Sequence, residues 1–492
     1  MKILTLLALL VPILSGIALL IVRPQSRAKR NRYVMLEVSL SAVFILGTAL
    51  CSALRGPDAV YLHVADLSDK LVIAFRPDGV SLVFGCIIGV LWPVTTVYAF
   101  SYMAHEGREN MFFGFFLITF GVVAGIAYSA NFFTLYLCYE FMTLVTLPLV
   151  MHEMDDKARA AGKKYVLYSM TGAALVFICL MYFLRYADTL AFTYGGILNP
   201  EKVKGHEREL MTVFVLGFFG FGVKAAIFPF HHWLPTASVA PTPVTALLHA
   251  VAVVKSGAFA VCRLIYFGFG CDFLRGTWAQ HIVMCAAAFT VMFGTGMALR
   301  QDHLKRRLAY HTVSNLSYII LGFTAMSPMG LLGGLLHLIY HSVIKITLFF
   351  CAGAILHNNG LEYVHTMEGI KKKMPVTAAS FTVAALALMG VPPFGAFLSK
   401  WTLGVASAAS GGFPGVLGAA ALVVSAILTT LCMMSAVIHF YFPTREAPPL
   451  PEGFHEADAL MKGSLLFLVG LIVLLSLCSA PLCSWIGGFV SC

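Results

Sequence analysis

The sequence predicts an all-α polytopic membrane protein with about fourteen transmembrane helices. Two observations carry this prediction. Of the 492 residues, 59% are hydrophobic and only 11% are charged, and the mean hydropathy is +0.86, whereas soluble domains carry about 25% charged residues. In addition, apolar stretches of about 20 residues, the length that crosses a bilayer, recur along the whole chain.

Short polar connections separate these stretches, and each stretch predicts one spanning helix. The first has an apolar run of about 20 residues and lacks a small-residue cleavage site, so we expect a retained helix rather than a signal peptide. The expected helices cover residues 2–22, 33–53, 79–103, 111–130, 132–151, 163–186, 209–229, 242–268, 279–299, 308–326, 329–356, 376–402, 412–442 and 461–489.

The 33 Lys and Arg residues outnumber the 23 Asp and Glu residues, but their placement argues against a nucleic-acid partner. Most lie in alternate connections, such as 23–32, 157–164, 300–307 and 371–373. The positive-inside rule makes these connections cytoplasmic, which places both termini outside. We expect the membrane to be a prokaryotic cytoplasmic membrane. Such basic connections also favour contact with anionic lipid headgroups.

The seventh and twelfth expected helices each contain a lysine near a proline. Lys224 is followed by Pro229, and Lys400 is preceded by Pro392 and Pro393. Proline removes a backbone donor and breaks a helix, and paired breaks beside charges are typical of inverted-repeat transporters. The alternative is that proline and glycine are simply common in transmembrane helices.

We therefore expect two inverted five-helix repeats with flanking helices. The expected units are 1–103 for helices 1 to 3, 104–268 for helices 4 to 8, 269–442 for helices 9 to 13, and 443–492 for a loop and helix 14.

Glu140 is an acidic residue inside an apolar stretch, and Lys224 is its natural partner. A charge in the bilayer core costs about 2.5 to 3.5 kcal/mol on insertion scales, so such residues normally line a polar path. An ion pair that opens and closes would change the protonation of the lysine. The alternative is a static structural ion pair.

The eighth expected helix carries His249 and Lys255. Six residues apart on one continuous helix, they point about 120° away from each other. We expect Lys255 to relay protons and His249 either to orient the site or to pack as a hydrogen-bonded histidine.

The eleventh expected helix places His337, His341 and Lys345 four residues apart, hence on one face. Histidines with an ordinary pKa near 6.5 suit proton hopping through water. Metal binding by the two histidines is the weaker alternative, because the zinc pattern H-E-x-x-H is absent. Lys305, at a cytoplasmic helix start, taken alone is mainly a topology signal.

No cofactor is expected in this chain. The 12 cysteines are scattered singly with no C-x-x-C pair, which argues against an iron–sulfur cluster or a zinc site. No P-loop or strand-linked G-x-G-x-x-G is present, so an ion gradient or a partner must drive any transport.

Taken together, several motifs resemble the antiporter-like family of complex I pumping subunits, membrane subunits of energy-converting membrane-bound hydrogenases and the D-type component of Mrp antiporters. The resemblance covers nearly the whole chain. Its motifs are Glu140, the K-A-x-x-x-P-F-H-x-W-L-P stretch from Lys224, A-P-T-P-V-T-A-L-L from Ala240, Q-D-x-L-K-R-x-L-A-Y from Gln301, H-x-x-x-K-x-x-L-F from His341, and G-V-P-P-F-G-A-F-L-S-K-W ending at Trp401.

The resemblance implies roles for the buried groups. Lys224 would be the central lysine paired with Glu140, Lys255 or His249 the relay, and Lys400 the terminal proton site. It further implies that His337 and Lys345 belong to a hydrophilic axis and that Lys305 lies near the join of two half-channels.

The leading expectation is a subunit that translocates protons, or is coupled to sodium ions, in a redox-driven complex. Iron–sulfur or nickel–iron cofactors would then lie in peripheral redox partners, and antiporter-like paralogues would be neighbouring membrane subunits. The chain has no long lateral helix after helix 14, which favours a hydrogenase-type or Mrp D-type protein over a classical complex I subunit. The alternatives are a component of an Mrp-type antiporter without a redox partner, and a solute transporter or membrane scaffold.

Overall fold

Helices begin where the sequence supplies a polar cap after a connection. Seven of the described helices have an N-cap side chain that accepts a hydrogen bond from a backbone N–H three residues further on, which satisfies a donor left free at the helix start. These caps are Ser26, Asp78, Asn131, Asp155, Thr277, Ser327 and Asp458.

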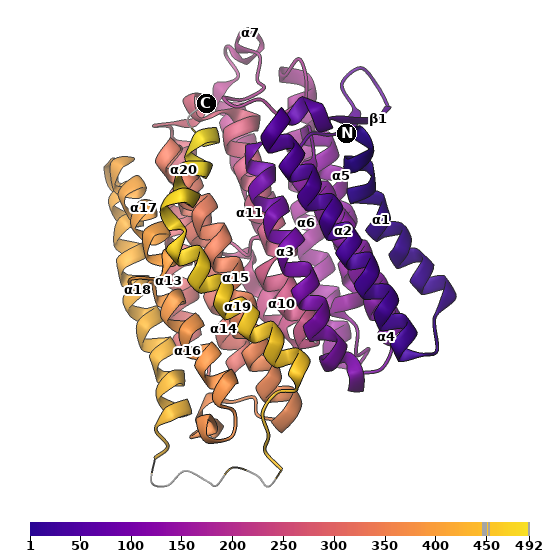
Figure 1. Ribbon diagram of the computed structural model, residues 1–492. Coiled ribbons are helices and arrows are strands. Elements are labelled where there is room, and N and C mark those ends of the chain that lie inside the picture. The colour runs from indigo at the N-terminus through magenta and orange to yellow at the C-terminus, as the bar shows by residue number, and fades with distance from the viewer. Residues whose placement is uncertain (445–449, 451–452, 491–492) are drawn as a thin grey trace.

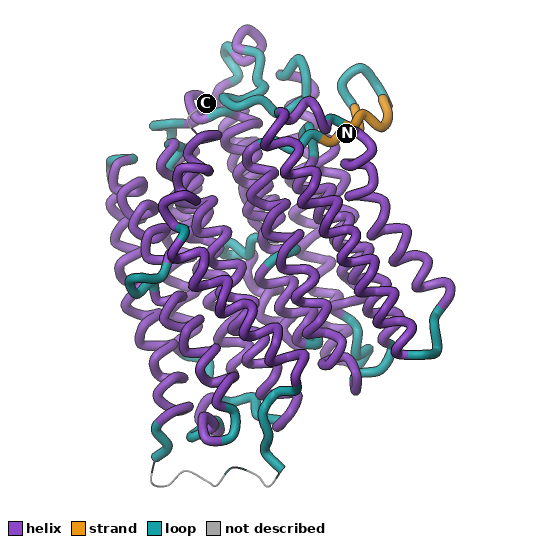
Figure 2. The backbone as a smooth tube through the Cα atoms, in the orientation of Figure 1, coloured by secondary structure: helices purple, strands orange, loops and turns teal. Residues whose placement is uncertain are grey.

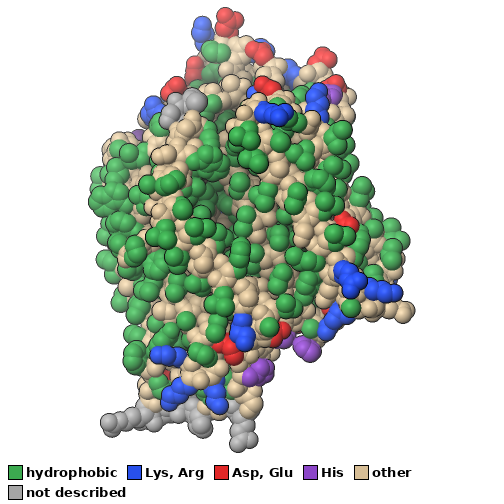
Figure 3. Space-filling model, in the orientation of Figure 1, with side chains coloured by type: hydrophobic (Ala, Val, Ile, Leu, Met, Phe, Trp, Pro, Cys, Tyr) green, Lys and Arg blue, Asp and Glu red, His purple; other side chains and the backbone are tan. Residues whose placement is uncertain are grey.

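The computed structural model describes residues 1–444, 450 and 453–490, and long helices running side by side make up most of it (Figure 1). Figure 2 shows that strands occur only in one small hairpin among the described residues. Within the same residues, eleven helices are long and apolar enough to cross a membrane. Hydrophobic side chains cover the middle of the visible face, and charged side chains gather near its two ends (Figure 3). This distribution is that of a polytopic membrane protein.

The first half of the chain contains α1 Lys2–Val22, α2 Arg27–Arg55, β1 Leu62–Asp66, β2 Val72–Phe75, α3 Gly79–Tyr102, α4 Glu109–Tyr128, α5 Phe132–Val150, α6 Asp156–Tyr186, α7 Pro200–Val203, α8 Glu207–Lys224, α9 Trp233–Thr236, α10 Thr242–Ala250, α11 Val253–Cys262 and the π-helix η5 Arg263–Phe269.

The second half contains α12 Cys271–Leu274, α13 Trp278–Leu299, α14 Leu304–Thr324, α15 Pro328–Asn359, α16 Pro375–Met389, α17 Gly395–Ala409, α18 Gly412–Tyr441, α19 Ala459–Leu477 and α20 Ser479–Val490. The helix α15 is central: it packs against α3, α10, α14, α16, α17 and α19.

The expected breaks in the seventh and twelfth stretches are present. Helix α8 ends at Lys224 itself, and the chain continues through a turn and the short helix α9. Pro392 and Pro393 lie between α16 and α17. Lys224 therefore lies at the C-terminus of α8, and Lys400 follows the break after the C-terminus of α16. At a helix C-terminus the last backbone carbonyls lack partners within the helix.

Three stretches differ from the prediction. The stretch 242–268 is not one helix: Val251 and Ala252 interrupt it, and its end is wound as a π-helix. The last stretch is divided at Cys478. The antiparallel hairpin of β1 and β2 was not predicted, because its nine strand residues lie in a connection with no apolar run of membrane length. Part of the expected unit 443–492 (445–449, 451–452, 491–492) lies outside the described residues.

Candidate functional site

The end of α8 holds a fully buried lysine. The ammonium group of Lys224 donates to the backbone carbonyl of Tyr139 on α5 and lies 3.4 Å from the centre of the Tyr139 ring. The indole N–H of Trp233 donates to the Val223 carbonyl at 2.7 Å, which satisfies one of the carbonyls freed by the break. Lys224 is thus held by a carbonyl dipole and an aromatic face.

The predicted ion pair between Glu140 and Lys224 is not formed. Within the part of the chain that the structure describes, no carboxylate oxygen lies within 4.0 Å of the Lys224 nitrogen. One carboxylate oxygen of Glu140 is buried and has no hydrogen-bond partner. Lys224 lies on the Tyr139 ring. Glu140 is the next residue of α5, so its side chain points about 100° around the helix from that of Tyr139. The pair is therefore open.

The interruption between α10 and α11 corrects the prediction for His249 and Lys255, which both face α15. The imidazole of His249 packs on the Phe349 ring with centroids 4.9 Å apart, and Lys255 Nζ lies 2.6 Å from His341 Nδ1. The 120° separation holds only for an unbroken helix, and the irregular residues 251–252 reset the rotation.

The predicted common face on α15 is confirmed. The rings of His337 and His341 stack with centroids 5.8 Å apart, and Lys345 Nζ donates to the Leu308 carbonyl of α14 at 2.8 Å. His337 also reaches across to Ser399 Oγ at 3.0 Å and to Asn315 Oδ1 at 3.3 Å. This face thus links α11, α14 and α17 through polar side chains.

Lys400 lies near the start of α17. We call Lys224, Lys255, His337, His341, Lys345 and Lys400 together the row. The Nζ of Lys400 donates to the carbonyls of Leu388 and Met389 at 2.6 and 3.1 Å and lies 5.4 Å from the centre of the Tyr318 ring. Both carbonyls belong to the last turn of α16, which ends just before the prolines. A helix C-terminus carries partial negative charge, so the break itself provides the binding site for this cation.

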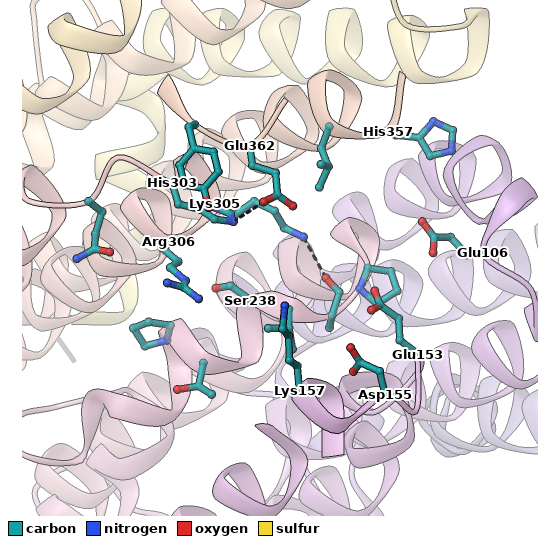
Figure 4. A pocket seen from close by; sticks show the side chains of 18 of the residues that line it. Glu106, Glu153, Asp155, Lys157, Ser238, His303, Lys305, Arg306, His357 and Glu362 are labelled. Atoms are coloured by element: carbon teal, nitrogen blue, oxygen red, sulfur yellow. Dashed lines mark hydrogen bonds and ion pairs between the residues drawn. The ribbon is translucent and has the colours of Figure 1, made fainter. Parts of the chain in front are cut away.

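A polar cavity of about 800 Å³ opens where α5 ends and α14 begins. Figure 4 shows carboxylates and basic side chains on its walls. We call this cavity the vestibule. Its charged and histidine side chains are His105, Glu106, Glu153, Asp155, Lys157, His232, His303, Lys305, Arg306, His357 and Glu362.

Lys305 forms part of the inner wall of the vestibule. It is 6% exposed, and its Nζ donates to the Ala240 carbonyl, just before α10, at 3.1 Å (Figure 4). Burial raises the pKa of Glu153, and the nearby carboxylates of Glu106 and Asp155 raise it further. A carboxyl group with a raised pKa holds a proton closer to neutral pH, so this wall can exchange protons with water.

Several polar residues of the site were not predicted from sequence. The carboxylates of the vestibule lie in connections far apart in the chain, where acidic residues are ordinary. His311 on α14 is 0% exposed, and neither ring nitrogen has a partner. An available signal was its position in an apolar helix, the same criterion that selected His249.

Comparison with known proteins places this geometry in a family. Residues 129–429 match the model described as NADH:quinone oxidoreductase/Mrp antiporter, TM. The chain is 30% identical over 419 residues to NADH-quinone oxidoreductase subunit N of Desulforudis audaxviator, covering 81% of this chain and 82% of that protein. It is 31% identical over 407 residues to the A/B component of a probable K+/H+ antiporter of Rhizobium meliloti, covering 81% of this chain but only 39% of that longer protein.

The fold also matches a solved structure. A chain of the membrane-bound sulfane sulfur reductase, an archaeal respiratory membrane complex, superposes with a TM-score of 0.85 at 20% identity, covering 100% of this chain and 98% of that one. The matched stretch 129–429 contains Glu140 and all the buried lysines and histidines described above. The chain therefore belongs to the antiporter-like family of transmembrane subunits shared by NADH:quinone oxidoreductases and Mrp antiporters.

Proposed function

We propose that this chain translocates protons across the membrane along its buried row of lysines and histidines. The observation that carries the proposal is the continuity of the row. Lys255 bonds His341, His341 stacks on His337, and His337 bonds Ser399, the residue before Lys400. A charged or titratable residue at this depth costs free energy that packing alone does not require.

The vestibule is the proposed entrance. Lys305 at its inner wall bonds the chain just before α10, and α10 carries His249, which packs against the Phe349 ring of α15. Lys345 Nζ lies 6.0 Å from the centre of the same ring. A proton that enters beside Glu153 can thus pass by way of the titratable groups Lys305 and His249 to Lys345 and so reach the row.

The opening and closing of the Glu140–Lys224 pair is the proposed coupling step. In the structure the pair is open and Lys224 lies on Tyr139. Movement of the ammonium group to the free Glu140 oxygen would stabilise its charge, and its return would release that stabilisation.

The finer architecture is also a proposal: about fourteen transmembrane helices with two inverted five-helix units, 104–268 and 269–442, in a prokaryotic cytoplasmic membrane. Its support is that a helix break accompanies an intramembrane lysine once in each half, at the fully buried Lys224 and the partly buried Lys400.

We propose that the chain works in a redox-driven respiratory complex, beside antiporter-like paralogues and peripheral subunits that hold iron–sulfur or nickel–iron centres. The 82% coverage of an NADH-quinone oxidoreductase subunit supports this assignment. The second candidate is a D-like component of an Mrp-type Na+/H+ antiporter without a redox partner. The similarity to part of a probable K+/H+ antiporter supports the antiporter role.

The test is proton uptake by vesicles containing the native complex, purified through a tag on this chain. Glu140→Ala and Lys224→Ala should each abolish uptake while the same subunits co-purify, because each removes one member of the pair. Lys202→Gln is the matched control, since Lys202 is exposed and pairs with Asp188 at 2.6 Å outside the row. Near-normal uptake in Glu140→Ala or Lys224→Ala contradicts the proposed role of the pair.

Mass spectrometry of the same preparation separates the two candidates. Co-purifying iron–sulfur or nickel–iron subunits support the redox-driven complex. If only small membrane subunits and paralogues appear, the chain belongs to a gradient-driven antiporter.

A further inference from the structure

His311 and His341 lie at matching positions on two antiparallel helices. Helices α14 and α15 are joined by the short connection 325–327 and pack along their length. Two hydrogen bonds define how they are aligned: Lys345 to the Leu308 carbonyl at 2.8 Å, and His337 to Asn315 at 3.3 Å.

His311 lies between these two contacts. It is three residues after Leu308 and four before Asn315, so all three are near one face of α14. His341 is likewise four residues from both Lys345 and His337 on α15. The alignment therefore places His311 opposite His341, as the middle step of a three-step polar ladder. The Asn315 amide also donates to the His311 carbonyl at 2.8 Å, so the contact between His337 and Asn315 lies one helical turn from His311.

Three of the four ring nitrogens of His311 and His341 have no hydrogen-bond partner. Both ring nitrogens of His311 and the Nε2 of His341 are buried without a partner, whereas His341 Nδ1 meets Lys255. A neutral imidazole has one donor and one acceptor, and leaving a buried polar group unpaired costs about 1 to 3 kcal/mol. A water molecule between the two rings would satisfy one nitrogen of each.

The cations around His311 favour the neutral form of its ring. The charged groups that act on it are Lys345, Arg307 and Lys400, and none is a carboxylate. Arg307 is already bonded to the carbonyls of Gln301 and Cys432 and to Ser435. The lysines and the titratable His341 remain as proton donors or acceptors.

We propose that His311 is a relay residue that receives a proton from the Lys255–His341 pair through one bridging water. This inference rests on the proposed proton translocation. When the Lys255 ammonium gives a proton to His341 Nδ1, the N–H bond at Nε2 breaks and its proton goes to the water. The water gives one of its own protons to His311. The other nitrogen of His311 then releases a proton toward a neutral Lys345, so charge and atoms balance and one proton has moved.

This step gives a proton on His341 two possible routes. A proton on His341 can continue along α15 through the stacked ring of His337, or cross to α14 through His311 and reach Lys345. His311 would thus connect the Lys255 branch with the side of α15 that faces His249 and the vestibule.

The test of the His311 relay is to replace its imidazole ring by a side chain that still forms hydrogen bonds. His311→Gln keeps a polar side chain of similar size that cannot carry a proton, and proton uptake by the reconstituted complex should fall at least tenfold. Ser317→Ala is the control on the same helix, because Ser317 is equally buried and its hydroxyl bonds only the Val313 carbonyl. It should keep uptake within twofold of the unmodified complex. Uptake above half in His311→Gln overturns the relay.

A measurement on the unmodified complex covers the case in which His311→Gln fails to assemble. Deuterium exchange at the C2 carbon of each histidine ring, read by mass spectrometry, requires water and a protonated ring. His311 should exchange measurably, and the exposed His63 provides the reference. If His63 exchanges fully and His311 not at all, His311 is a dry packing residue and the proposal fails.

A parallel variant separates this inference from the proposed function. If Lys255→Gln abolishes uptake and His311→Gln does not, protons follow the row without His311. If Lys255→Gln also keeps full uptake, the row itself does not carry protons.

Discussion

At the scale of residues, the buried cations fall into two kinds with different physical consequences. Arg263 is fully buried and forms a bidentate pair with Asp78, at 2.5 and 2.7 Å, and also bonds Ser81. The row lysines bond only neutral carbonyls, aromatic faces or imidazoles. Breaking a buried charge pair is costly, so Arg263 keeps its proton, whereas a buried amine without a carboxylate partner can exchange one.

Asp78→Asn should therefore reduce stability without entering the transport route. The change leaves the Arg263 charge buried and unpaired, which costs about 3 kcal/mol, and it also weakens the cap of α3. The measurement is the thermal unfolding midpoint of the detergent-purified chain. Asp58→Asn is the control, because Asp58 is 82% exposed and pairs with Arg76 at the surface; exposed pairs contribute about 0 to 1 kcal/mol. Equal midpoints for the two variants would contradict this assignment.

The same pair predicts a pH dependence. Burial acts to raise the pKa of Asp78, but the charge and hydrogen bonds of Arg263 outweigh it and hold the pKa below the ordinary value of 3.8. A carboxylate with a lowered pKa contributes stability above its unfolded pKa and loses it as pH falls through its folded pKa. The stability difference between the unmodified chain and Asp78→Asn should be constant near neutrality and shrink below pH 3.8. A difference that grows in acid would reverse this interpretation.

At the scale of elements, the breaks depend on close backbone approaches. Helix α11 passes the end of α8 at Gly257, where a Cβ atom would lie 2.5 Å from the Ala225 nitrogen and 2.9 Å from the Lys224 carbonyl carbon. Only glycine allows this approach without a backbone shift. This contact holds α11, which carries Lys255, against the backbone of Lys224.

Gly257→Ala should separate α11 from Lys224 and lower proton uptake at least tenfold, at a cost of about 1 to 3 kcal/mol in stability. Gly296→Ala on α13 is the matched control, because no atom lies within 4 Å of the added Cβ, and helical alanine is favoured over glycine. Uptake in vesicles and co-purification of subunits measure both effects. Unchanged uptake in Gly257→Ala would show that the close approach does not position Lys255.

At the scale of the whole molecule, both ends of the described chain lie at the same end of the bundle (Figure 1). Together with the basic connections, this predicts that the two termini face the outside of the membrane. Protease-cleavable tags added before Met1 and after Cys492 should both be cut from outside intact cells. A tag in the connection at 371–373 should be protected until the membrane is opened. Cleavage of one terminal tag alone would contradict the shared side.

The sequence by itself determined the membrane class, the positions of the apolar helices, the two proline breaks and the lysines beside them, because each depends on local hydrophobicity, helix period or proline chemistry. The common face of His337, His341 and Lys345 followed from helix geometry alone. Only the tertiary structure decided that the Glu140–Lys224 pair is open, that residues 251–252 turn both His249 and Lys255 toward α15, and that distant loops form the vestibule. These features depend on how separate helices are aligned and rotated against each other, and that alignment comes from packing between residues far apart in the chain.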